Sequence, residues 1–193
     1  MEKYKIIYFD ETINLEDIKE QLKNYSLEET VIFVKEGTET IITDLDSVMN
    51  KINILLDNYD IFYLSNVMDS CSGKLNVIEE INGLKFYVSR SPNGFYATAS
   101  KKKNWVKILR FLGHNNFKNI SDGLNNLVVS GDISALTSWP RIYNPKNNYG
   151  FYPCRDESIT EKKSSPEYEM SVYYFIVSCL ILTIFLTTFH RYS

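Results

Sequence analysis

The chain has 193 residues, a length that suits one domain with its own hydrophobic core and a shorter additional segment. Lys and Arg total 21 against 24 Asp and Glu, so the net charge is −3 and the basic footprint of a nucleic-acid-binding protein is excluded. Cys71, Cys154 and Cys179 lie far apart without the paired spacing of a zinc site. No signal peptide is expected at the amino terminus, and these thiols indicate a reducing compartment.

The first expected elements are a strand and a helix. Residues 5–9 form an apolar run, and Asn14 is placed to cap a helix over residues 15–25 whose apolar side chains share one face.

Residues 29–69 are the stretch around which the chain is organised. They predict a strand at 30–34, a polar elbow at 35–40, an amphipathic helix at 47–56 and a second strand at 60–64. Both strands are apolar without alternation, which is typical of strands covered on both faces in a parallel sheet. Ligands in open α/β sheets bind outside the carboxyl ends of such strands, so the elbow is the expected place for chemistry.

A hairpin and then a short apolar run are expected next. Two strand candidates at residues 74–80 and 84–90 flank Asn82 and Gly83, a strong signal for a tight hairpin turn. A second turn leads into the short run 95–99.

Two more helices and a strand complete the expected domain. Ser100 is placed to cap a basic helix, and Ser121 with Asp122 is placed to cap a further helix that Gly131 ends. A closing strand is expected at residues 134–139. The basic helix is either a solvated surface or a site for phosphate or anionic lipid, and its cations are Lys101, Lys102, Lys103, Lys107 and Arg110.

The carboxyl-terminal part of the chain predicts a membrane anchor. Residues 172–189 contain no charged side chain, and a helix over 170–190 would be about 30 Å long, the thickness of the hydrocarbon core of a bilayer. The expected organisation is therefore a domain at 1–143, a polar linker at 144–169, a transmembrane helix at 170–190 and a short tail at 191–193.

The position of this helix favours a single-pass, tail-anchored protein with its large domain in the cytosol. The sequons that begin at Asn24 and Asn119 could be used only if the domain were lumenal, so their occupancy tests this topology. The partners expected are the membrane and a protein, with no nucleic acid.

Three segments in a fixed order resemble glycosyltransferase family 25, in the short form carried by large DNA viruses. They are YDIFYL at 59–64, NGFYATAS at 93–100 and SDGLNNLVVSGDISALTSWP at 121–140. The resemblance covers roughly residues 29–144. It implies an α/β fold, a reduced GT-A (Rossmann-like) sheet flanked by helices, and suggests a viral protein on a host or virion membrane.

The family's activity depends on a Glu-Asp-Asp elbow, whose carboxylates hold a divalent metal against the diphosphate of a nucleotide-sugar. The matching residues here are Lys35, Glu36 and Gly37, so only one carboxylate is kept. In addition, only about 28 residues precede residue 29, where GT-A enzymes use one or two strands to hold the nucleotide base, so a complete nucleoside pocket is not expected. The favoured interpretation is therefore a non-catalytic structural or interaction module that needs no cofactor.

The alternative is an active transferase that uses Mn²⁺ or Mg²⁺ and moves a hexose from a nucleotide-sugar to a protein or glycan acceptor. Glu36 would then be joined in metal binding by Asp44 or Asp46, or Lys35 itself would neutralise the leaving diphosphate. The favoured interpretation of these two residues is the amino terminus of a helix, which Asp46 caps and whose dipole Asp44 suits. Asp122 matches a family residue that could orient an acceptor, and a plain helix cap explains it as well.

Overall fold

The computed structural model describes residues 4–10, 13–65, 68–69, 77–115, 117 and 119–145. All of them lie in one compact unit, Met1–Asp156. The predicted transmembrane helix lies outside the described residues. Among the residues that are described, no helix is both long and apolar enough to cross a bilayer.

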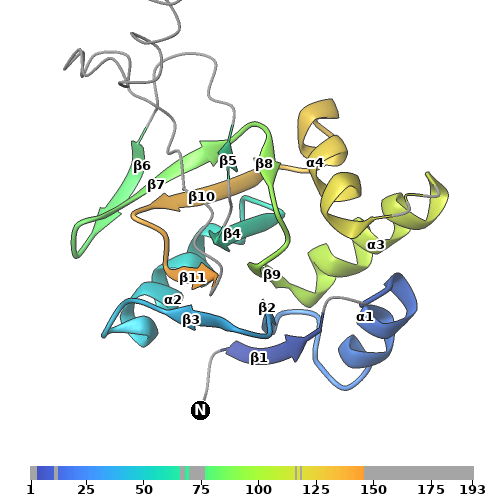
Figure 1. Ribbon diagram of the computed structural model, residues 1–193, viewed down its shortest axis with the longest axis horizontal. Helices are drawn as coiled ribbons and strands as arrows, with labels where there is room; N and C mark the ends of the chain where they lie inside the picture. The colour runs from blue at the N-terminus through green and yellow to red at the C-terminus, as the bar shows by residue number, and fades with distance from the viewer. Residues whose placement is uncertain are drawn as a thin grey trace, which may run out of the picture. The chain divides into compact units, whose positions relative to one another are not determined.

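A mixed sheet of seven strands forms the centre of the described domain (Figure 1). In spatial order its strands are β1 (Tyr4–Phe9), β2 (Thr30–Lys35), β9 (Ala97–Lys101), β4 (Ile61–Ser65), β10 (Ala135–Trp139), β7 (Leu84–Ser89) and β6 (Val77–Ile81). The pairs β1–β2 and β4–β10 are parallel. Strand β9 is antiparallel to both of its neighbours, β2 and β4.

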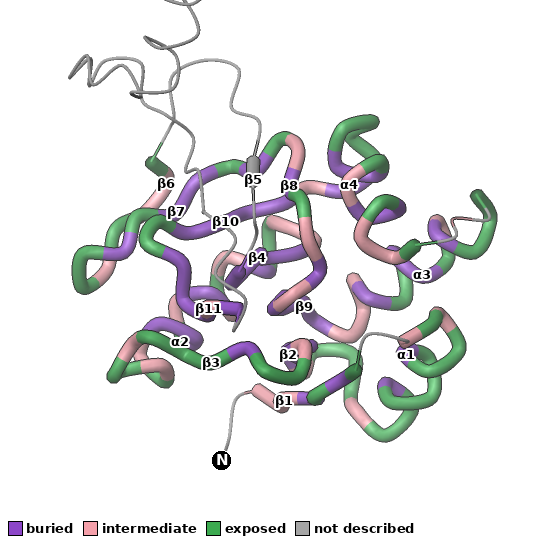
Figure 2. The backbone as a smooth tube through the Cα atoms, in the orientation of Figure 1, coloured by how far each residue is buried: buried purple, intermediate pink, exposed green. Residues whose placement is uncertain are grey.

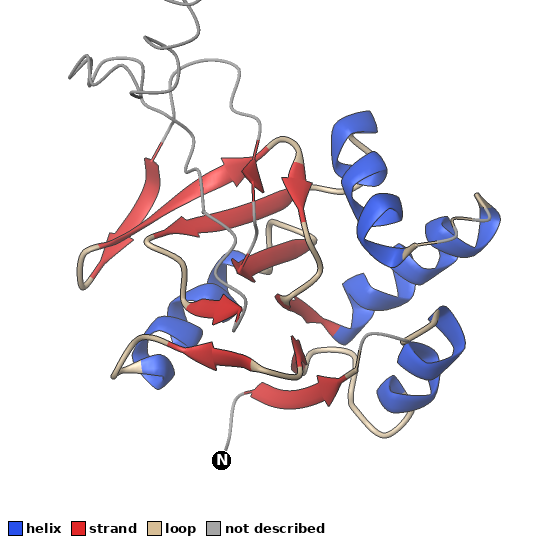
Figure 3. Cartoon of the chain, viewed as in Figure 1, coloured by secondary structure: helices blue, strands red, loops and turns tan. Residues whose placement is uncertain are grey.

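Helices cover both faces of this sheet (Figure 3). Helices α1 (Leu15–Leu22), α3 (Lys102–His114) and α4 (Ile120–Ser130) pack on one face, and α2 (Leu45–Leu55) packs on the other. Each face has its own hydrophobic core, and Figure 2 shows buried residues along the central strands between them. The prediction of an α/β sheet flanked by helices is confirmed.

Two short ribbons complete the described strands. Strand β3 (Thr38–Thr40) pairs with β11 (Tyr143–Pro145), and β5 (Met68–Asp69) pairs with β8 (Pro92–Asn93). The predicted elbow therefore contains a strand of its own, and the first residues of the predicted linker, Asn144 and Pro145, belong to β11.

Local sequence signals explain several of these elements. Asn14 caps α1 as predicted, in a capping box in which Asp17 bonds back to the Asn14 amide at 3.0 Å. Asn82 and Gly83 have positive φ values of 50° and 80°, which the predicted tight hairpin between β6 and β7 requires. Gly131 ends α4 in the left-handed conformation, also as predicted.

The prediction of a parallel sheet was only partly right: β2 and β4 run in the same direction, but β9 lies between them and runs antiparallel to both, so the sheet is mixed. The short run 95–99 contributes most of this central strand. Ser100 is a strand residue rather than a helix cap, and its hydroxyl donates to the Asp60 carbonyl at 2.5 Å. Helix α3 begins after Lys101, which makes no side-chain capping bond.

The cap of α4 was also predicted two or three residues too late. Asn119 is the N-cap, and its Oδ1 accepts from the Ser121 amide at 2.8 Å. Ser121 and Asp122 lie in the first turn of the helix instead, where an acidic side chain suits the helix dipole.

Candidate functional site

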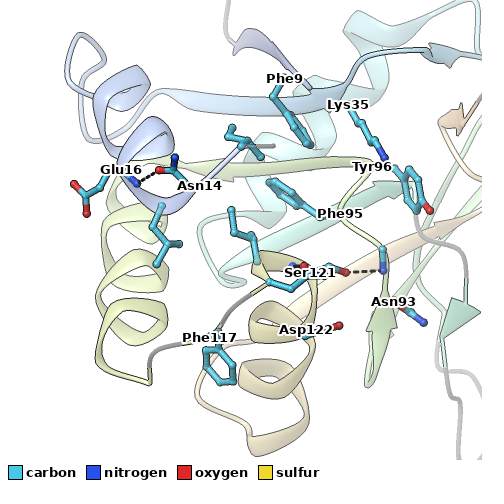
Figure 4. A pocket seen from close by; sticks show the side chains of 15 residues that line it. Phe9, Asn14, Glu16, Lys35, Asn93, Phe95, Tyr96, Phe117, Ser121 and Asp122 are labelled. Carbon is cyan, nitrogen blue, oxygen red and sulfur yellow. Dashed lines mark hydrogen bonds between the residues drawn. The ribbon is translucent and has the colours of Figure 1, made fainter. Parts of the chain in front are cut away.

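A cavity of about 790 Å³ opens at the carboxyl ends of β1 and β2. We call it the strand-end pocket. Four parts of the chain build it: the ends of the two strands, the start of α1, the segment 93–96 and the start of α4 (Figure 4). This is the edge of the sheet at which the sequence predicted a ligand site.

Aromatic rings form the apolar part of the strand-end pocket and connect it to the core. Phe9 and Phe95 stack with ring centroids 4.9 Å apart. Phe95 in turn packs in a T-shaped arrangement with Trp105, a fully buried residue of α3, and their ring centroids lie 6.2 Å apart. Because these rings are fixed by the core, the apolar wall is preorganised for a ligand with a flat or apolar surface.

Lys35 supplies a positive charge at the end of β2. Its ammonium lies 5.4 Å from the centre of the Tyr96 ring, and its amide donates to the Tyr96 carbonyl at 2.7 Å. The second contact holds the backbone of the elbow against the segment 93–96. The strand therefore delivers the Lys35 side chain to the pocket from a fixed backbone position (Figure 4).

The first turns of α1 and α4 form polar walls of the strand-end pocket. Asn14 Oδ1 accepts from the amides of Glu16 and Asp17 at 2.9 and 3.1 Å, and Asn119 similarly caps α4. The Gly94 amide donates to Ser121 Oγ at 3.1 Å, which ties α4 to the segment before β9. Since side chains already cap both helices, polar side chains rather than bare helix amides form much of these walls.

Of the predicted site residues, the structure brings Lys35 and Asp122 to the same pocket, from β2 and from α4. Glu36 does not line it. Its side chain is exposed, and its amide donates to the Phe9 carbonyl at 2.8 Å, which joins the ends of β2 and β1.

The two aspartates before α2 have other partners. Asp44 is the N-cap and accepts from the Ser47 amide at 3.1 Å, while Asp46 accepts from the Tyr4 hydroxyl at 2.6 Å. No group of three His, Cys, Asp or Glu side chains that could hold a metal ion occurs within the described part of the chain. The set Glu36, Asp44 and Asp46 is therefore not assembled as a metal site among these residues.

Sequence reasoning did not assign several pocket residues to a site. Asn14 and Asn119 were recognised as a helix cap and a sequon, and Asn93 and Tyr96 as parts of a turn and of a short run. Position was the available signal for Asn14, which follows β1, and for Tyr96, which precedes β9, while Asn119 lies between two helices and gave no such signal.

The charged side chains that line the strand-end pocket are Glu16, Lys35 and Asp122. Together with the asparagine amides and the aromatic wall, they suit a polar ligand that offers both hydrogen-bonding groups and a flat face. The arrangement can bind and orient such a ligand.

Most of the basic cluster predicted on α3 is neutralised. Lys107 contacts both carboxylate oxygens of Asp60, at 2.9 and 3.0 Å, and Lys103 pairs with Glu28 at 2.9 Å. Lys101 is buried and pairs with Asp57. Because these three side chains are ion-paired, they do not form a continuous cationic surface. Lys102 donates to the carbonyls of Lys23 and Tyr25 instead, and Arg110, farther along the helix, is considered separately.

Comparison with known proteins gives no assignment. No protein-family model matches the chain, and no curated protein matches it significantly.

Proposed function

We propose that the chain is a membrane-tethered, glycosyltransferase-like protein of reduced GT-A type that acts as an interaction module rather than as an enzyme. Its cytosolic domain binds a polar ligand or a segment of a partner protein in the strand-end pocket, and residues 170–190 hold it on the membrane. The proposal extends to a viral origin only through the resemblance in sequence.

One observation carries the non-catalytic part of this proposal. The elbow presents Lys35 to the strand-end pocket, where a metal-dependent transferase needs carboxylates, while Glu36 does not line the pocket. A lysine ammonium repels a divalent cation and attracts an anionic group of a ligand. The pocket is therefore better suited to bind a ligand directly than through a metal.

The second candidate function is transfer of a hexose from a nucleotide-sugar. It is favoured by the presence of Lys35 and Asp122 on one pocket, because a cation could neutralise a leaving diphosphate and a carboxylate could orient an acceptor hydroxyl. In this case Glu36 would need to turn toward the pocket to take part in metal binding.

Thermal unfolding separates the two functions. The fragment Met1–Asp156, which contains both cores, is melted with and without UDP and Mn²⁺. Ligand at a hundred times its dissociation constant adds about 2.7 kcal/mol, a shift of several degrees for a domain of this size. We expect no shift.

A shift that Glu36→Ala removes would contradict the non-catalytic proposal. Glu39→Ala is the matched control, because Glu39 is an exposed carboxylate nearby in β3. A shift that both variants keep would show nucleotide binding that does not depend on Glu36.

The membrane topology is tested by glycosylation in eukaryotic cells. Asn24 is exposed in the loop after α1, so its sequon is accessible if the domain enters the lumen. We expect the chain to be unglycosylated at Asn24, and a sequon appended after Ser193 to be modified. The reverse pattern would place the domain in the lumen and contradict the proposal.

A further inference from the structure

A second cavity, of about 470 Å³, lies between α1 and α3, away from the strand-end pocket. We call it the helix groove. The two helices pack side by side (Figure 1). The groove is lined by Lys19, Val106, Leu109, Arg110, Gly113 and His114.

The helix groove combines an apolar floor with basic edges. Leu109 is almost fully buried at its base, and Val106 is 51% exposed beside it. Lys19 of α1 and Arg110 of α3 are the cationic groups of the lining, and no acidic side chain is among the described residues that line it. Long basic side chains beside an exposed aliphatic residue are typical of surfaces that enter the headgroup region of a membrane.

Two of the acidic residues of α1 have partners outside the groove lining, while Glu16 pairs with Lys19 at the edge of the groove and offsets its charge. Glu16 pairs with Lys19 at 2.5 Å, Glu20 pairs with Lys23, and Asp17 accepts from the Asn14 amide. Within the described part of the chain, Arg110 makes no ion pair, in contrast to Lys103 and Lys107 on the same helix. Arg110 therefore remains available in the groove for an anionic group.

The predicted membrane anchor indicates which ligand the helix groove meets. Residues 146–169 separate β11 from the predicted transmembrane helix. A segment of this length reaches at most about 80 Å. A domain held this close to a bilayer meets its surface at high effective concentration, so each modest contact is strengthened.

From the chemistry of the lining and this tether, we infer that the helix groove binds the headgroup of an anionic phospholipid. The phosphate of the lipid lies against Arg110, beside the Lys19–Glu16 pair, and Val106 enters the boundary of the acyl chains. The inference rests on the membrane tether of the proposed function, and it adds a second contact that orients the domain on the bilayer.

The test is lysine acetylation of the full chain in lipid nanodiscs, followed by mass spectrometry. Pure phosphatidylcholine discs are compared with discs in which about one lipid in five is phosphatidylserine. We expect Lys19 to be acetylated about fivefold more slowly in the anionic discs, the factor for one basic residue at an anionic surface. Lys85, an exposed lysine of β7, provides the internal reference and reacts equally in both.

Two charge reversals complete the experiment. Arg110→Glu is expected to remove the protection of Lys19, and Arg90→Glu, the same charge reversal at an exposed arginine after β7, is expected to leave it. Equal acetylation of Lys19 in both kinds of disc would overturn the inference, whether fast, because nothing covers the groove, or slow, because something other than an anionic lipid covers it. A chain that does not co-elute with either disc would instead contradict the membrane tether, and the lipid site with it.

Discussion

The two ends of the sheet's strands use charge in different ways. At the amino ends of β4 and β10, the Asp60 carboxylate accepts from Lys107 Nζ, from the Ser134 amide at 2.8 Å and from Ser134 Oγ at 3.1 Å. At the carboxyl ends of β1 and β2, Lys35 and Asp122 line a cavity instead. The first arrangement joins strands and a helix, and the second offers polar groups to a ligand. We call these two ends of the strands the amino edge and the carboxyl edge of the sheet. The comparison indicates that charged groups stabilise the fold at the amino edge and line the candidate site at the carboxyl edge.

The largest effect is expected at the amino edge, in Asp60→Ala. The Asp60 side chain is only 15% exposed, and its loss leaves Lys107 and two Ser134 donors without their acceptor. We expect a loss of about 3 kcal/mol in the free energy of unfolding, measured by urea denaturation of Met1–Asp156.

Asp122→Ala is the matched carboxylate at the other edge. It is exposed in the first turn of α4, and its removal is expected to change stability by about 0.5 kcal/mol. Equal losses in the two variants would contradict the division between the edges.

A smaller loss is expected where α4 packs below the strand-end pocket, in Gly123→Ala. A Cβ built at Gly123 lies 2.5 Å from Leu112 Cδ2 and 3.0 Å from the Phe117 ring, so α4 must move or these side chains must shift. We expect a loss of about 2 kcal/mol by urea denaturation. Gly113→Ala in α3 is the control, because nothing lies within 4 Å of its added Cβ and alanine favours a helix. A stabilised Gly123→Ala would show that the pocket wall is loosely packed.

The amino edge should also be sensitive to acid. The hydrogen bond from Lys101 is the largest cause that lowers the pKa of Asp57 below its ordinary value of 3.8. Since this pKa is lower in the folded than in the unfolded state, the stabilisation is present above the ordinary pKa and is lost as pH falls through the folded value. We expect Tm to fall below about pH 4, and to fall less steeply in Lys101→Met. In the control Lys85→Met, the dependence of Tm on pH should be unchanged. The same dependence in Lys101→Met as in the original protein would show that the Lys101–Asp57 pair does not contribute to the acid sensitivity.

The smallest effect on stability is expected at the carboxyl edge, in Lys35→Met. Methionine keeps the apolar stem and removes the ammonium over Tyr96, a contact worth about 0.5 kcal/mol near the surface. We expect urea denaturation to show little change, while binding of any anionic ligand in the strand-end pocket weakens. A loss as large as that of Asp60→Ala would make Lys35 a structural residue.

Local signals in the sequence were sufficient for much of the fold. The apolar runs that became β1, β2 and β4, the asparagine cap of α1 and the Asn82–Gly83 turn were all recognisable, because each depends on neighbouring residues. Strand β9 was underestimated because its sequence, ATASK, contains a single residue that favours strands, Thr98, among small and polar residues. It is a strand because β2 and β4 pair with it on both sides, which depends on distant parts of the chain.

The candidate site was predictable in place but not in composition. The carboxyl end of β2 and its lysine followed from the strand pattern and the rule for ligand sites in α/β sheets. The acidic set was not brought together, because Asp44 caps α2 and Asp46 binds Tyr4. The asparagine and aromatic lining comes from segments far apart in the sequence, so no local pattern could reveal it.

The order of strands in the sheet has a consequence for synthesis. A ribosome that has released residues up to 90 has supplied two strand pairs, β1–β2 and β6–β7, and an isolated β4. In the sheet formed by the described strands, β9 joins β4 to β2, and β10 joins β4 to β7. The nascent domain therefore remains in separate pieces until Trp139 has emerged, and we expect truncation before this residue to leave aggregation-prone strand edges rather than a smaller domain.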